Sequence, residues 1–178
     1  MYLERKVLNR RAGYFLITLA IVILDQLSKR WAMLDLRGNS DIVIIPGLLN
    51  LSYTTNAGIA FGMLGDSGLM VKWMLMVISI AAAVFVAAYA LRTPLTSRLL
   101  LVSLALLLAG ILGNLIDRML LGYVIDFIDI HYESYHWPTF NLADMAISIG
   151  AILLAIDLLR AHQTQSAAER PVNVDENF

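Results

Sequence analysis

The sequence predicts an all-α membrane protein with four transmembrane helices and a small extracytoplasmic β-hairpin segment. Hydrophobic residues make up 59% of the 178 residues, and the mean hydropathy is +0.72. Soluble domains contain only about 45–50% apolar residues. The apolar residues form four long runs, and a more polar, glycine-containing stretch separates the first run from the second. These observations place most of the chain inside a bilayer.

The charge balance and the absence of cysteine exclude several function classes. The net charge is −1 at pH 7, and the basic residues are spread along the chain, so we expect no nucleic-acid partner. Because there is no cysteine, disulfide bonds, thiolate catalysis and cysteine-based metal sites are excluded.

The first apolar run follows a basic N-terminus, as in the n- and h-regions of a signal peptide. No small-x-small cleavage site follows it, so we predict an uncleaved helix over residues 12–34, which is long enough to cross a hydrocarbon core of about 30 Å. The later runs predict spans over residues 69–91, 99–121 and 140–160. We therefore expect one membrane domain over residues 1–160 and a polar cytoplasmic tail over residues 161–178.

The segments between the spans differ in character. Residues 35–67 contain Pro46-Gly47 between short apolar stretches, which predicts a β-hairpin on the membrane surface. Residues 122–139 are rich in aromatic side chains and are interpreted as a loop. Lysine and arginine are concentrated in the N-terminus, the 92–98 linker and the C-terminal end. By the positive-inside rule, both termini are cytoplasmic and both long loops face outward.

This topology brings several polar groups together in the outer third of the bilayer. Asp25, Asn114, Asn141 and Asp144 converge at this depth, and Asp126 lies just beyond the third span. Two neighbouring carboxyl groups at one membrane face can share a proton and activate water. Because polar residues are sparse in the inner halves of the spans, we expect a one-sided site and no conduit across the membrane.

Each polar pair also has a structural interpretation. Asp25 and Lys29 lie four residues apart on one helix face, and a buried ion pair is favoured over a direct chemical role. Asn114 and Arg118 have the same spacing and face the same way, whereas Asp117 is turned partly aside. The sequence favours neither of two interpretations of Arg118: an interfacial arginine beside a capping asparagine, or a functional arginine.

The remaining candidates have structural alternatives of their own. Asn141 and Asp144 have the spacing of a helix N-terminal cap, which explains Asn141 better than Asp144, whose neighbours are apolar. Asn56, followed by small residues, is more often part of a turn than of a site.

A metal site is the alternative for one further group. His131 and His136, together with Asp129 and Glu133, could bind a metal ion, but no HExxH-type helical spacing is present. We interpret them as part of a wet interfacial loop and predict no metal and no cofactor.

Four blocks of sequence indicate membership of one family. They are DQLSK at residues 25–29, NAGIAFG at residues 56–62, GNLIDR with GYVIDF across residues 113–127, and FNLAD at residues 140–144. In order and context they resemble the bacterial lipoprotein signal peptidases (signal peptidase II), which are intramembrane aspartic proteases. The resemblance covers about residues 12–160.

The resemblance implies an endopeptidase of the bacterial inner membrane that needs no metal. Its substrates would be prolipoproteins, cut just before a cysteine that already carries diacylglycerol, and membrane lipids would be its other partners. Asp126 and Asp144 would be the catalytic pair, near the outer face of the membrane. Residues 35–67 would match the family's β-cradle and mobile helix, and we expect a monomer. The resemblance would assign substrate binding or orientation of the pair to Asn56, Asn114, Arg118 and Asn141. It would assign structural support near the site to Asp25 and Lys29.

Two other functions are compatible with intramembrane acids. A small proton-coupled transporter would need polar residues through the inner half of the spans. A non-enzymatic scaffold would tolerate the loss of Asp126. Both remain alternatives at the level of sequence.

Overall fold

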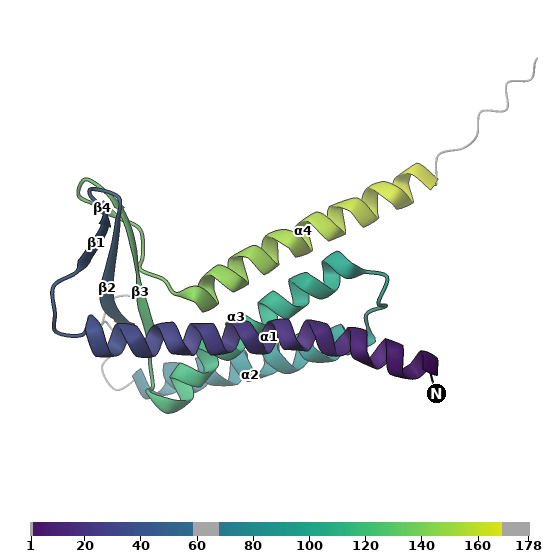
Figure 1. Ribbon diagram of the computed structural model, residues 1–178, viewed down its shortest axis with the longest axis horizontal. Helices are drawn as coiled ribbons and strands as arrows, with labels where there is room; N and C mark the ends of the chain where they lie inside the picture. The colour runs from purple at the N-terminus through teal and green to yellow at the C-terminus, as the bar shows by residue number, and fades with distance from the viewer. Residues whose placement is uncertain (1, 59–67, 169–178) are drawn as a thin grey trace, which may run out of the picture.

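The structure, a computed structural model, describes residues 2–58 and 68–168 and consists of helices with a small sheet at one end (Figure 1). In chain order the elements are α1 (Tyr2–Asp35), β1 (Ile42–Ile45), β2 (Leu49–Asn56), α2 (Gly68–Arg92), α3 (Arg98–Leu120), β3 (Val124–Tyr132), β4 (Tyr135–His136) and α4 (Leu142–Ala168).

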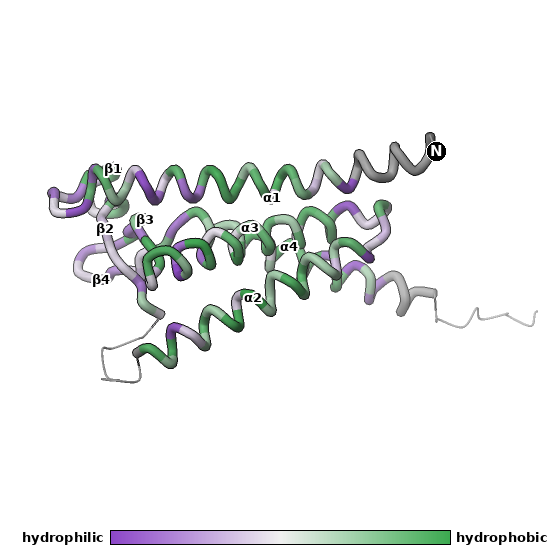
Figure 2. Tube along the Cα trace, turned by 90° about the horizontal axis from the view of Figure 1, so that it is seen from below, coloured by the Kyte–Doolittle hydropathy of each residue, from purple (hydrophilic) through white to green (hydrophobic). Residues whose placement is uncertain are grey.

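Within the described residues, four helices are long and apolar enough to cross a membrane. They cover Arg11–Asp35, Leu69–Arg92, Arg98–Leu120 and Leu142–Gln163, which confirms the predicted membrane fold. Figure 2 shows hydrophobic residues along these helices and more hydrophilic ones towards their ends and in the sheet. Many large apolar side chains on them are exposed, among them Leu24, Val84 and Phe85. Such an exposed apolar surface is suited to lipid.

Helix α3 is the centre of the bundle. In its most apolar stretch 56% of residues are buried, against 17% in each of the other three spans. Helix α4 packs closely on it through glycines. A Cβ atom at Gly110 would collide with the backbone of Ala143, and one at Gly150 would lie 3.0 Å from the Ser103 carbonyl oxygen. Small residues at such positions let membrane helices approach closely.

The sheet lies where α1 and α3 end and where α2 and α4 begin (Figure 1). Its strands are antiparallel in the order β1-β2-β3-β4, which confirms the predicted hairpin within residues 35–67. Apolar side chains anchor β3 to the end of α1, because Ile125 and Phe127 pack with Ala32 and Leu36. The other predicted feature of this segment, a mobile helix, overlaps residues 59–67, which lie outside the described residues.

The interpretation of residues 122–139 as a loop was wrong. Nine of them form β3, which pairs with β2 along most of its length. Leu51 of β2 pairs with Ile128 and Thr54 pairs with Asp126, so two residues of β2 face one of β3. This is the arrangement of a β-bulge, which often re-aims a side chain beside a functional site.

Helix α4 is longer than the span predicted for it. Helix α4 continues to Ala168, about two turns beyond the predicted end of the span. The added segment, AHQTQSAA, contains alanine and glutamine, which favour a helix, and no glycine or proline that would end one.

The close contact between α3 and α4 predicts the effect of one added methyl group. Gly110→Ala should destabilise the protein by about 1–3 kcal/mol, because the Cβ atom has no room against α4. Gly13→Ala is the matched control, since nothing lies within 4 Å of a Cβ atom at that position, and it should be neutral or slightly stabilising. Unfolding of both variants in mixed detergent micelles measures the difference, and equal stability would contradict the packing described.

Candidate active site

A buried lysine stands at the centre of the polar groups. The Lys29 side chain is 2% exposed, and its ammonium nitrogen lies 2.9 Å from Asp25 Oδ2, 3.0 Å from Asp117 Oδ2 and 2.9 Å from Asn114 Oδ1. An ammonium group has three protons to donate. These three acceptors therefore satisfy it fully.

The two acids beside Lys29 connect the helices to the sheet. Asp25 Oδ1 accepts a hydrogen bond of 2.9 Å from the backbone N–H of Ala143, at the start of α4. Asp117 Oδ2 accepts one of 3.1 Å from the backbone N–H of Ile125, at the start of β3. The predicted Asp25–Lys29 pair is thus present, and the same network holds β3 and α4 in position.

Asp117 was described from the sequence as turned partly aside, and this was wrong. Its side chain is 3% exposed and also accepts a 2.9 Å hydrogen bond from the Gln26 side-chain amide. Helical spacing within α3 alone could not reveal the contact, because its partners come from α1 and β3. Sequence reasoning assigned no role to Gln26.

The Lys29 network continues to Asp144 through an amide. Asn114 Oδ1 accepts from Lys29, and Asn114 Nδ2 donates a 2.8 Å hydrogen bond to Asp144 Oδ1. One amide therefore connects the ammonium group to a carboxylate of α4. Arg118, predicted beside Asn114, donates a hydrogen bond of 3.4 Å to the Asn114 carbonyl oxygen and stays half-buried.

Asn141 and Asp144 form the predicted cap at the start of α4. Asn141 Oδ1 accepts from the Asp144 backbone N–H at 2.9 Å, and Asp144 Oδ2 accepts from the Asn141 backbone N–H at 3.2 Å. This reciprocal pattern is that of a capping box. The cap accounts for one oxygen of Asp144, while Asn114 binds the other.

The side chain of Asn141 also binds Asp126 of β3. Its amide nitrogen donates to Asp126 Oδ1 at 2.7 Å, in addition to contacts of 3.2 Å with Asn114 Oδ1 and the Ile125 carbonyl oxygen. Asn141 is fully buried and Asp126 is 1% exposed. A single residue therefore contacts both predicted acids, one from the sheet and one from α4.

The surroundings of Asp126 favour its protonated form. Burial, followed by the negative charge of Asp144, raises the pKa of Asp126 from 3.8 to about 6. Hydrogen bonds from the side chains of Asn56 and Asn141 act in the opposite direction, because they stabilise the carboxylate. Two carboxyl groups whose charges disfavour each other in a buried place are suited to hold one proton between them.

Asn56 reaches this group from the end of β2. It pairs with Val124 of β3, and its side-chain oxygen accepts a 2.8 Å hydrogen bond from the backbone N–H of Gly58. That local bond is the turn expected from the sequence, while the amide also acts on Asp126. The turn is thus present, and a role of Asn56 in substrate binding or in orienting the acids stays a prediction.

Comparison with known proteins identifies the family. A family model described as signal peptidase (SPase) II matches residues 17–160. A lipoprotein signal peptidase of Pseudomonas aeruginosa (strain UCBPP-PA14) is 39% identical over 159 residues, covering 89% of this chain and 94% of the relative. The chain belongs to the signal peptidase II family.

Further relatives and solved structures agree with this assignment. The lipoprotein signal peptidase of Cellvibrio japonicus (strain Ueda107) is 33% identical over 96% of this chain and 99% of its own. Two solved structures, both described as bacterial membrane enzymes, superpose with TM-scores of 0.73 and 0.74 at 32% and 33% identity. They cover 91% and 83% of this chain, and 95% and 93% of their own. The resemblance inferred from four blocks thus extends through the whole signal peptidase II fold.

The Lys29 network predicts a strong effect of removing its cation. Lys29→Met should destabilise the protein by about 3–5 kcal/mol, because Asp25 and Asp117 would be left as buried acids without a counter-charge. Lys72→Met removes an exposed lysine of α2 and should change the unfolding midpoint little. If both variants unfold at the same denaturant concentration as the parent, Lys29 is not the centre of the site.

Proposed function

We propose that this protein removes the signal peptide from prolipoproteins by aspartic proteolysis, cutting just before the lipid-modified cysteine. Asp126 and Asp144 are the catalytic pair, and Asn141 and Asn114 position them. The observation that carries this proposal is the placement of Asn141, whose side chain contacts Asp126 and caps the turn that carries Asp144. Membership of the signal peptidase II family supports it.

The proposed reaction divides the work between the two carboxyl groups. The ionised one removes a proton from water, whose oxygen attacks the scissile carbonyl carbon. The protonated one donates its proton to the carbonyl oxygen, giving a neutral diol. The diol then collapses: the carboxyl group that gave up its proton takes one from a diol hydroxyl, the other carboxyl group donates its proton to the leaving nitrogen, and the C–N bond breaks. Both groups thereby return to their starting states. Asp126 is assigned the shared proton because its pKa is raised. Asp144, whose two oxygens accept hydrogen bonds from Asn114 and from the Asn141 backbone, is assigned the role of base.

The position of the pair suits a lipid-anchored substrate. Asp126 lies on the sheet and Asp144 on the first turn of a span, so the pair lies near the boundary of the apolar region. By the positive-inside rule, the sheet end faces outward and both termini are cytoplasmic in the inner membrane. A monomer could then take its substrate from the outer leaflet, where the acyl chains would remain.

The alternatives of a proton-coupled transporter and a scaffold are not favoured. In the described residues, the buried charged groups are at the sheet end of the bundle. Buried hydroxyl groups elsewhere bind backbone carbonyls: Thr18 donates to Ala105 and Ser103 to Leu100. Each of these hydroxyl groups donates to a backbone carbonyl, one across two helices and one within α3, so these two side chains do not continue a proton relay.

The proposal predicts the result of neutralising each acid. Asp126→Asn and Asp144→Asn keep the side-chain volume but remove the titratable group, so each should reduce cleavage of a diacylglyceryl-modified prolipoprotein by at least about 10⁴-fold. The double variant should be no worse than either single one, as expected for residues that act as a unit. A gel-shift assay with purified protein in lipid measures this. Asp35→Asn, an exposed acid at the end of α1, is the control and should cleave normally. Substantial cleavage by either single variant would overturn the aspartic mechanism.

The raised pKa of Asp126 predicts the pH dependence of the reaction. As pH rises through about 6, Asp126 loses its proton and can no longer act as the proton donor, so kcat/KM should fall above that pH. At much lower pH kcat/KM should fall as well, because no ionised carboxyl group is left to act as the base. Asn56→Ala removes a hydrogen bond that favours the ionised form. The variant should therefore move the descending limb to higher pH. A pH profile of kcat/KM tests this, and a shift to lower pH would contradict it.

A further inference from the structure

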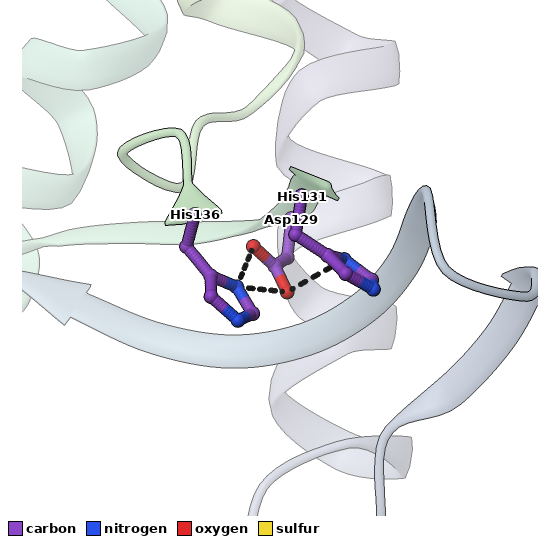
Figure 3. A group of neighbouring side chains, drawn as sticks. All are labelled: Asp129, His131 and His136. Atoms are coloured by element: carbon purple, nitrogen blue, oxygen red, sulfur yellow. Dashed lines mark hydrogen bonds and ion pairs between the residues drawn. The ribbon is translucent and has the colours of Figure 1, made fainter. Parts of the chain in front are cut away.

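A second cluster of chemically active side chains lies on the β3–β4 hairpin. Asp129 and His131 are two residues apart in β3, so they project from the same face. His136 of β4 pairs directly with His131, which brings its side chain to that face as well. Figure 3 shows the two imidazoles on either side of the Asp129 carboxylate.

The geometry of this cluster matches what a small cation requires. His136 Nδ1 lies 2.9 and 3.1 Å from the two oxygens of Asp129, and His131 Nδ1 lies 3.6 Å from Oδ2. One potential ligand atom from each residue lies within 4.8 Å of the others. Ligands at about 2.0–2.2 Å from a tetrahedral zinc ion are about 3.3–3.6 Å apart. Only small side-chain movements would therefore bring three donors onto one ion.

Unsatisfied lone pairs distinguish this cluster from an ordinary histidine–aspartate contact. Among the described residues, His131 Nδ1 is buried without a hydrogen-bond partner, although its ring stacks on that of His136 with centroids 4.9 Å apart. Asn50 Oδ1 is also buried without a partner, and Asn50 pairs with Asp129 across β2 and β3. A buried polar atom without a partner costs free energy, and coordination of a cation by His131 Nδ1 would remove that cost at this atom.

We propose that Asp129, His131 and His136 form a binding site for a divalent transition-metal ion, with zinc as the best match. Two imidazoles and a carboxylate are typical zinc ligands, whereas calcium and magnesium prefer oxygen ligands alone. His136 is 55% exposed, so the ion can enter from solvent and keep water in its fourth position. Sequence reasoning named these three residues but predicted no metal because a helical spacing was absent; the structure brings them together from two paired strands instead.

The ion would act as a clamp on the sheet. Strand β4 has only two residues, and a bond from His136 through the ion to Asp129 and His131 would fix it to β3. Asp126 is three residues before Asp129, so the two side chains leave β3 on opposite faces. The site is therefore structural and separate from the proposed proteolytic pair, and it does not depend on the proposed function.

Metal binding by the purified, tag-free, full-length protein tests the proposal. Isothermal titration with ZnCl₂ should give one saturable site per chain, MgCl₂ should give none, and zinc should raise the thermal unfolding midpoint. Cobalt bound at the same site should show the visible absorption of tetrahedral coordination.

Two variants and one control locate the site. His136→Gln and His131→Gln should each weaken zinc binding by at least about 100-fold and abolish the rise in midpoint. Because His136 is largely exposed, its variant should fold normally in the absence of zinc. His162→Gln removes the remaining histidine of the chain, which is exposed on α4, and should bind zinc like the parent. Absence of a saturable site, or equal weakening in His162→Gln, would show an ordinary histidine–aspartate contact and overturn the proposal.

Discussion

The structure depends on the burial of one ammonium group among apolar helices. A lysine in a membrane span costs about 2.5–3.5 kcal/mol on insertion scales, and hydrogen bonds to charged groups return about 1.5–3 kcal/mol each. Lys29 makes three such contacts. Three satisfied contacts are enough to offset the cost of burial, while the loss of any one would leave a buried charge partly unpaired. This constraint fixes α1 against α3 at one depth.

The same network positions Asp126 and Asp144. Asp25 holds the start of α4 through its second oxygen, and Asp117 holds the start of β3 through the same oxygen that binds Lys29. Asn114, which also binds Lys29, donates a hydrogen bond to Asp144. Asn141 then closes the network by capping α4 and binding Asp126. The contacts of Asn141 therefore both cap the start of α4 and hold the proposed catalytic pair in place. The raised pKa of Asp126 is a cost of this arrangement, and such costs are common at functional sites.

Sequence reasoning succeeded where one physical effect dominates. Long apolar runs predict the spans. Asp126 and Asp144 were proposed as a pair because acids are costly beside apolar segments, and the structure brings both into contact with Asn141. Strand β3 was missed because Val124, Ile125, Asp126 and Phe127 are all buried, so the alternation that predicts a half-exposed strand is absent. The contacts of Asp117 and the convergence of His131 with His136 also could not be predicted, because each depends on partners from elements far apart or on strand register. Local patterns thus predict elements and residue types, whereas pairing between elements needs the fold.

In the proposed mechanism, Asp126 and Asp144 work as one unit around a single water. An experimental structure of the protein in lipid, at a resolution that shows ordered water, tests this most directly. We expect one water within about 3 Å of an oxygen of each carboxyl group, in the space that the scissile carbonyl would share. Separate waters on the two carboxyl groups, with oxygens too far apart for one water to bridge, would contradict the account.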